Sequence, residues 1–166
     1  MTDIKTTPHD TPHRNGAENK LRLENQLCFP LYAASRKIIR LYTPLLTPLG
    51  LTYTQYITLM ALWDKDGLPI KTLGEMLFLD SGTLTPLLKK LESQGIVRRE
   101  RHKNDERNVS VFLTDKGRSL KNDALPIPEK MATCVPLKSE DASSLYNILY
   151  QILRNDSDSE KPKTCE

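Results

Sequence analysis

A cysteine at position 28 lies in a segment whose apolar residues recur at helical spacing. A thiolate is a nucleophile that can be oxidised to a sulfenic acid. The reaction needs a lowered thiol pKa and access to the oxidant. Tyrosine hydroxyls can stabilise the thiolate because they donate hydrogen bonds to it. The candidate donors are Tyr32, Tyr42 and Tyr53. Without other support, however, a lone cysteine on an apolar helix face is more often a small core residue.

The spacing of the tyrosines decides which of them reach the thiol. Tyr32 lies one helical turn after Cys28, so the two side chains are neighbours on one helix. Tyr42 is fourteen residues after Cys28, which is about 21 Å along a continuous helix at 1.5 Å per residue. If both tyrosines serve one site, Tyr42 must come from a second subunit. The spacing then predicts a thiol site that straddles a dimer interface.

A second group of chemically useful residues lies between about 72 and 107. The helix expected over 83–94 has polar residues near its start, where free backbone N–H groups favour phosphate, and two lysines further along. We expect contacts to base edges and phosphates from Ser81, Thr83, Thr85, Lys89 and Lys90.

The charged segment after this helix predicts a β-hairpin that also meets DNA. Its five cations stand against three anions, so it is not a uniformly basic patch. Asp105, two residues before Arg107, is placed to brace that guanidinium and aim it at the minor groove. A charged hairpin tip alone is equally well explained as a solvated turn, and the helices directly upstream favour DNA contact. The cations are Arg98, Arg99, Arg101, Lys103 and Arg107.

The thiol segment must be carried by a helix expected over 23–49, where two apolar stripes keep helical spacing. Two stripes make a wider apolar face than one partner helix needs, which suits a dimer interface as well as a core. Pro30 removes a backbone hydrogen bond, so we expect the first turns around Cys28 to be bent or loose. We expect Pro44 and Pro48 to end or kink the helix.

Downstream, the pattern predicts helix, tight turn, helix and charged hairpin, which is the order of a winged helix-turn-helix. The expected helices cover residues 53–63, 70–79, 83–94, about 114–122 and 138–153, with returning strands near 96–97 and 109–113. The predicted fold class is mainly α (α+β): a winged helix-turn-helix with interlocking N- and C-terminal dimerisation helices.

The composition of the chain limits its class. The 166 residues are 38% apolar, which allows one compact domain with a thin core and leaves room for a partner subunit. The net charge of +3 permits nucleic-acid binding without arguing for it. No apolar run approaches the ~20 residues of a membrane span, and no secretory signal is visible. Three distant cysteines form neither a disulfide framework nor a zinc site. We expect a cytoplasmic protein without metal or cofactor.

Three stretches carry a family resemblance: LENQLCFPLYAASRKIIRLYTPLL, TYTQY, and LFLDSGTLTPLLKKLESQGIVRRERHKNDERNVSVFLTDKG. They resemble the MarR family of regulators and, within it, the organic-hydroperoxide-sensing (OhrR-type) repressors. The resemblance covers about residues 23–131 and includes the pair Asp105 and Arg107. It implies a homodimer whose first and last helices interlock and whose two winged domains meet a near-palindromic operator in double-stranded DNA.

The resemblance also assigns roles to the cysteines. It implies that Cys28 senses organic hydroperoxide and that Cys134 is a resolving thiol for an intersubunit disulfide. A small thiol is the alternative resolving partner for Cys28, and Cys165 in the polar tail would be a bystander. Oxidation would change the dimer geometry and release operator DNA.

These inferences divide the chain into a disordered arm (1–19), dimerisation helices (20–52 and 116–154), a DNA-binding domain (53–115) and a polar tail (155–166). Two other functions remain open. One is a MarR-type repressor that responds to an anionic aromatic ligand, with Cys28 structural. The other is a thiol-dependent peroxidase, which is disfavoured because the chain shows no Cys–His arrangement: His102 is in the hairpin, and His9 and His13 are in the arm.

Overall fold

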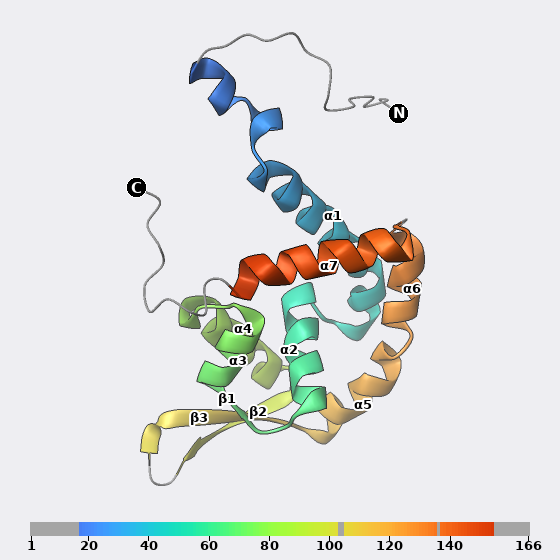
Figure 1. Ribbon diagram of the computed structural model, residues 1–166. Helices are drawn as coiled ribbons and strands as arrows, with labels where there is room; N and C mark the ends of the chain where they lie inside the picture. Colours follow the sequence, from blue (N-terminus) through green and yellow to red (C-terminus); the bar gives the residue numbers. More distant parts are fainter. Residues whose placement is uncertain (1–16, 103–104, 136, 155–166) are drawn as a thin grey trace. The chain divides into compact units, whose positions relative to one another are not determined.

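The computed structural model describes residues 17–102, 105–135 and 137–154 (Figure 1). It divides into two compact units, residues 1–127 and 128–166, each of which is described by itself. The expected tail, all but the last three residues of the expected arm, and the side chains of residues 102–108 lie outside the description. The chain is mainly helical with a small antiparallel sheet, so the predicted fold class is confirmed.

Helix α1 (Cys28–Leu46) begins at the thiol itself. The predicted helix over 23–49 is therefore too long at both ends, where short 3₁₀ turns occur instead: η2 (Leu23–Asn25) and η3 (Thr47–Leu49). A further 3₁₀ turn, η1 (Ala17–Leu21), precedes them. The first turns of the predicted helix are bent as expected, because Gln26 is extended between η2 and α1. Pro30 falls in the first turn of α1, where a backbone N–H has no intrahelical partner to lose.

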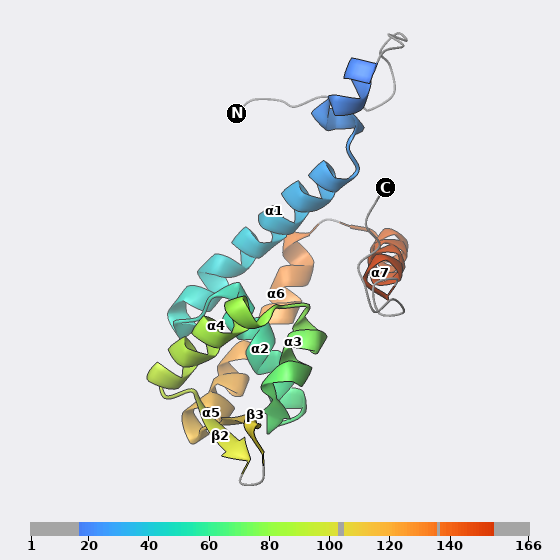
Figure 2. The same cartoon turned by 90° about the vertical axis from the view of Figure 1, so that its left-hand side faces the viewer.

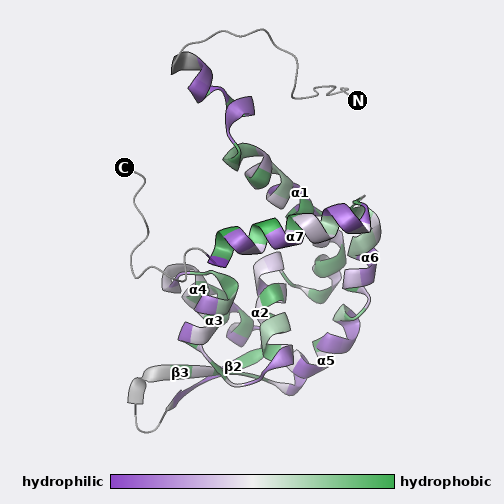
Figure 3. Ribbon diagram, viewed as in Figure 1, coloured by the Kyte–Doolittle hydropathy of each residue, from purple (hydrophilic) through white to green (hydrophobic). Residues whose placement is uncertain are grey.

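The first unit packs three further helices around a leucine-rich core: α2 (Tyr53–Asp64), α3 (Ile70–Leu77) and α4 (Ser81–Ser93). Helix α2 begins with a capping box, in which Thr52 and Gln55 satisfy each other's backbone N–H groups. The core side chains have almost no exposed surface; they include Leu59, Leu62, Leu73, Leu84, Leu88 and Leu91. Much of α1 is apolar as well (Figure 3), yet Leu46 is its one buried residue within this chain.

The sheet has three antiparallel strands in the order β1-β3-β2: β1 (Leu68–Pro69), β2 (Val97–His102) and β3 (Asp105–Leu113). Sequence analysis expected a hairpin and missed β1, because two residues are too few to show alternation. The strands also reach further into the charged segment than expected, with a register shift between Arg101 and His102. The hairpin and the start of α1 lie at opposite ends of this unit in both views (Figure 1, Figure 2).

Helix α5 (Asp115–Ala124) starts where expected, because the Thr114 side chain accepts the N–H of Gly117 at 3.1 Å. Helix α6 (Ile127–Cys134) was not predicted, since its prolines read as an interruption, but Pro128 stands in its first turn. Helix α7 (Ser139–Arg154) matches the expected last helix and has no buried residue within this chain. Among the described residues, no helix is both long and apolar enough to cross a membrane.

Candidate nucleic-acid interface and thiol site

The start of α4 is shaped by Asp80, the N-cap of the helix. Its carboxylate accepts both the backbone N–H and the hydroxyl of Thr83, at 3.0 and 2.8 Å. These hydrogen bonds lower the pKa of Asp80, so the cap stays ionised. The Thr83 hydroxyl proton is therefore already used, so its oxygen is left as an acceptor. Ser81 is exposed, and Thr85 is half-buried beside it.

The turn between α3 and α4 is strained at one residue. Phe78 has φ of +53°, the left-handed region that side chains with a Cβ disfavour, and its ring is 60% exposed. The turn closes through the Leu79 N–H, which donates to the Gly74 carbonyl at 2.9 Å. A Cβ at Gly74 would crowd the Leu79 carbonyl, so this helix-turn-helix needs the glycine.

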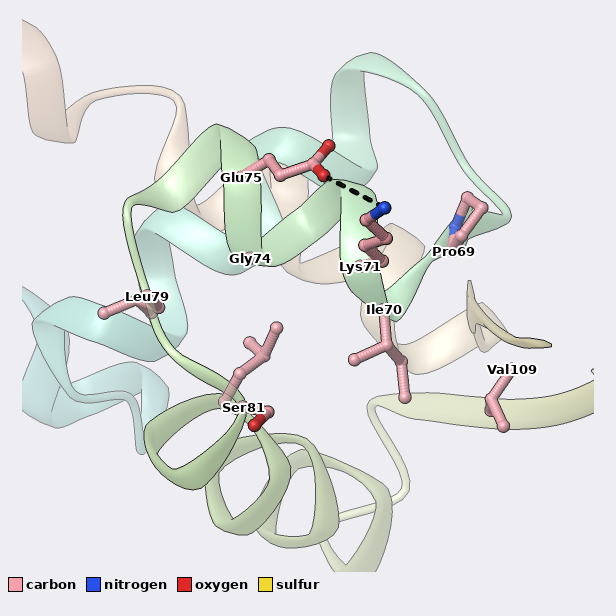
Figure 4. Close-up of a pocket in the computed structure, with 9 residues that line it drawn as sticks. Pro69, Ile70, Lys71, Gly74, Glu75, Leu79, Ser81 and Val109 are labelled. Atoms are coloured by element: carbon pink, nitrogen blue, oxygen red, sulfur yellow. Dashed lines mark ion pairs between the residues drawn. The ribbon is translucent and has the colours of Figure 1, made fainter. Parts of the chain in front are cut away.

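A cleft of about 460 Å³ opens between α3, the start of α4 and strands β1 and β3 (Figure 4). Ile70 and Val109 form apolar walls, and Ser81 lies at the α4 side. Lys71 and Glu75 pair across one turn of α3 at 3.9 Å, and both side chains are largely exposed. The cleft therefore lies on the face formed by the predicted reading helix and the hairpin.

Arg99, one of the predicted DNA contacts, is paired with a carboxylate of α4. Its guanidinium donates from Nε and Nη2 to Glu92 Oε2 at 2.9 and 2.5 Å, and its backbone N–H donates to Glu92 Oε1 at 3.1 Å. The two side chains are only 27% and 36% exposed. Arg99 thus braces β2 against α4, and its predicted contact with DNA stays a prediction.

The other predicted hairpin contacts have different settings. Arg98 pairs with Glu100 and lies over the Phe112 ring, 4.8 Å from its centroid. Arg101, Lys89 and Lys90 are exposed. The side chains of Lys103, Asp105 and Arg107 lie outside the described residues, so their roles stay predictions.

Asp66, which sequence reasoning did not single out, holds the base of the hairpin. Its Oδ1 accepts the N–H groups of Gly67 and Leu113 at 3.0 and 2.8 Å, and its Oδ2 accepts Arg118 at 3.0 Å. One carboxylate therefore ties the loop after α2 to the end of β3 and to α5. Only a contact between distant segments could have revealed it.

Cys28 is exposed on the first residue of α1, and Cys134 is exposed at the end of α6. Tyr32 lies one turn after Cys28 and is itself 55% exposed. The Tyr32 hydroxyl accepts a hydrogen bond from Arg36 Nη1 at 2.5 Å, which leaves its own proton free to be donated. Tyr32 is thus placed as predicted, on the helix that carries the thiol.

Tyr42 and Tyr53 form a separate group at the other end of α1. Their ring centroids are 4.8 Å apart, and Tyr56 lies 5.9 Å from Tyr42. Burial raises the pKa of all three phenols, so they remain protonated donors at neutral pH. Because α1 is one unbroken helix, Tyr42 does not reach Cys28 of its own chain. Sequence reasoning missed Tyr56, which was hidden among the core positions of α2.

The chain is similar to several known proteins. The family model for the transcriptional regulator SarA/Rot matches residues 40–124. The organic hydroperoxide resistance transcriptional regulator of Bacillus subtilis is 47% identical over 82% of this chain and 95% of that protein. The regulator SarZ of Staphylococcus aureus strain MRSA252 is 43% identical over 85% of this chain and 95% of that protein.

Among solved structures, AbfR of Staphylococcus epidermidis is similar in several states. Reduced AbfR bound to DNA matches with a TM-score of 0.69 and 35% identity, covering 83% of this chain and 96% of that one. Overoxidized AbfR bound to DNA has the same TM-score, with 36% identity over 83% of this chain and 97% of that one. Disulfide-formed AbfR matches with a TM-score of 0.59 and 35% identity, covering 83% of this chain and 94% of that one.

Proposed function

The chain belongs to the MarR-type family of transcriptional regulators, in the group of the organic hydroperoxide resistance regulators; we therefore propose that it is a repressor whose affinity for operator DNA is controlled by oxidation of Cys28. It is a DNA-binding regulator and not an enzyme. The observation that carries the redox part is the exposed thiol at the first residue of α1, in a relative of proteins that are described as reduced, overoxidized and disulfide-formed.

The DNA contacts are proposed on the face that holds the start of α4 and the hairpin. The exposed Ser81 and the half-buried Thr85 stand at the N-terminus of a helix of 13 residues, where unpaired N–H groups and the helix dipole attract phosphate. Lys89 and Lys90 are exposed further along α4 and bind backbone phosphates. Arg101 and Arg107 extend the contact along the hairpin, with Asp105 bracing Arg107. These residues lie in the DNA-binding domain proposed over 53–115.

The sensing step is proposed as a two-electron oxidation of one thiolate. The Cys28 sulfur attacks one peroxide oxygen, the O–O bond breaks, and the departing alkoxide takes up a proton and leaves as an alcohol. Tyr32 assists from the same helix. Tyr42 and Tyr53 act on Cys28 of the partner subunit, because α1 separates them from their own.

A homodimer is proposed from the apolar surface that α1 and α7 leave uncovered. Phe29 and Ile39 on α1 are each 40% exposed, and Ile148 and Ile152 on α7 are about half exposed. A chain with this much apolar helix surface is expected to cover it with a second subunit. The proposed dimerisation helices cover 20–52 and 116–154. The Cys134 sulfur then attacks the sulfenic acid of the partner's Cys28, the S–O bond breaks, and water leaves as an intersubunit disulfide forms, with a small thiol as the alternative partner.

The redox part is tested by operator release. Stoichiometric organic hydroperoxide should release the wild-type protein from operator DNA and leave Cys28→Ser bound. Cys134→Ser should still form the sulfenic acid but lose the crosslinked dimer on a non-reducing gel. Equal release of wild type and Cys28→Ser would refute thiol sensing. A crosslink that persists in Cys134→Ser would assign it to Cys165.

The DNA part is tested by the salt dependence of operator binding. Affinity should fall steeply with salt, because phosphate contacts release counterions. Arg107→Ala should weaken binding and reduce that dependence. If Arg107→Ala altered neither the affinity nor the salt dependence, the proposed hairpin contact would be wrong.

A further inference from the structure

Gln94 stands where α4 ends, and its side-chain amide bridges two distant segments. Its Nε2 donates to the carbonyl of Gly50 at 3.2 Å, and its Oε1 accepts from Gln55 Nε2 at 3.5 Å. Gly50 closes the turn after α1, and Gln55 lies in the first turn of α2. One side chain thus connects the end of α4 to the segment that joins α1 to α2.

Both partners of Gln94 are held firmly. Gly50 has φ of +67°, and the chain on either side of it is anchored by buried Leu46 and Leu51, whose backbone groups bond to each other at 3.2 Å. Gln55 is only 5% exposed, and its Oε1 accepts the Thr52 N–H at 2.9 Å. The bridge therefore joins rigid points rather than loose ends.

The turn at Gln94 and Gly95, where α4 ends, also binds the segment after the hairpin. Lys116 Nζ donates to the Gln94 carbonyl at 2.9 Å, and the Thr114 hydroxyl donates to the Gly95 carbonyl at 2.7 Å. Thr114 caps α5 directly after β3 ends. A displacement of the Gly50 turn would therefore be passed to α4 and to the base of the hairpin together.

Helix α1 supplies the lever for such a displacement. It runs without a break from Cys28 to Leu46, about 28 Å at 1.5 Å per residue, and the Gly50 turn follows it directly. A rigid helix that is moved at one end moves at the other. The side chain of Gln94 is a direct hydrogen-bonded contact between the segment after α1 and the end of α4.

We propose that Gln94 is a positioning residue that couples α1 to the DNA-reading helix, so that a change at Cys28 alters operator affinity through the Gln94–Gly50 bond. The inference rests on the proposed function, because it needs a signal that begins at the thiol. Gln94 touches neither the thiol nor the operator in this scheme, and its effect is on the coupling between them.

The test compares operator Kd for reduced and peroxide-oxidised protein in four forms: wild type, Gln94→Met, Gln94→Glu and Ser93→Ala. Methionine keeps the side-chain volume and removes both bonds, whereas glutamate keeps the acceptor for Gln55 and loses the donor to Gly50. Ser93→Ala is the matched control, because its hydroxyl bonds to the Lys90 carbonyl inside α4. Thermal unfolding of each variant checks that it is folded.

We expect Gln94→Met and Gln94→Glu to bind the operator within about twofold of wild type when reduced. Their ratio of oxidised to reduced Kd should fall by about 2- to 30-fold, the range that mutations along coupling networks produce. Ser93→Ala should keep the wild-type ratio. A wild-type ratio in both Gln94 variants would overturn this inference and leave the proposed function standing. A ratio of one in the wild-type protein itself would overturn the proposed function and the inference with it.

Discussion

The pair formed by Arg99 and Glu92 gives a prediction whose magnitude follows from the structure. Three hydrogen bonds join the two residues, and the guanidinium and carboxylate are each about one third exposed. Exposed ion pairs contribute about 0–1 kcal/mol, and hydrogen bonds to charged groups about 1.5–3 kcal/mol. We therefore expect a coupling free energy of about 1–2 kcal/mol, between those two limits.

The measurement is a double-mutant cycle with Glu92→Ala, Arg99→Ala and the double variant, by thermal unfolding of reduced protein at one fixed protein concentration. Each single variant should lower Tm by about 2–8 °C for a chain of this size. The double variant should be less destabilised than the sum of the two singles. If the two single effects simply add, within about 0.3 kcal/mol, Arg99 does not brace the hairpin.

The pH dependence of the same pair has a definite sign. Hydrogen bonds from Arg99 lower the pKa of Glu92 in the folded protein. The stabilisation is therefore present above the unfolded pKa and is lost as pH falls through the folded value. The gap in stability between wild type and Glu92→Ala should narrow on acidification below about pH 4. A gap that widens there would contradict the geometry.

Operator binding separates the bracing role from a DNA contact. Each phosphate contact adds about 0.9 to the slope of log affinity against log salt. Arg101→Met should reduce that slope by about this amount, whereas Arg99→Met should leave it unchanged. A reduced slope for Arg99→Met would mean that the guanidinium leaves Glu92 to meet DNA, as the sequence predicts.

Three further predictions concern single sites. Phe78→Gly should raise the free energy of unfolding by up to about 1 kcal/mol by relieving the left-handed backbone, and Phe78→Ala should not; equal Tm changes in urea-free thermal scans would argue against strain. Gly117→Ala should cost about 1–3 kcal/mol or more in denaturant unfolding, because its Cβ would overlap the Ile96 carbonyl; an unchanged midpoint would show that the backbone yields. Tyr42→Phe and Tyr53→Phe should slow sulfenic-acid formation at Cys28 by about tenfold, because each loses a hydrogen bond to a charged group. Operator binding by the reduced variants should be unchanged. If chemical trapping of the sulfenic acid proceeds at the wild-type rate, these phenols do not belong to the thiol site.

The parts of this fold that the sequence predicted are those governed by local rules. The cap at Thr114 depends on a side chain that bonds to a backbone N–H three residues away, and it occurs as expected. Helices α2 and α7 follow from apolar periodicity and agree with prediction to within a residue or so. The thiol and its helix were also found from residue type and spacing alone.

The misses share a different origin. Strand β1 exists because Leu68 and Pro69 pair with β3 more than forty residues away, and two residues carry no pattern of their own. Arg99 looked like one more free cation until folding placed Glu92 of α4 beside it. Tyr56 was indistinguishable from a core residue until α1 brought Tyr42 against it.

The sequence alone thus determined the chemistry that is present: a thiol on a helix, polar residues at a helix start, and a charged hairpin, each defined within one continuous stretch. The tertiary structure decided which of these groups are free and which are occupied, because their partners come from segments remote in the chain. It engaged Arg99 with Glu92, gathered the phenols at the far end of α1 from Cys28, and joined Gly50 to α4 through Gln94. Burial and long-range hydrogen bonds exist only after the chain has closed those distances.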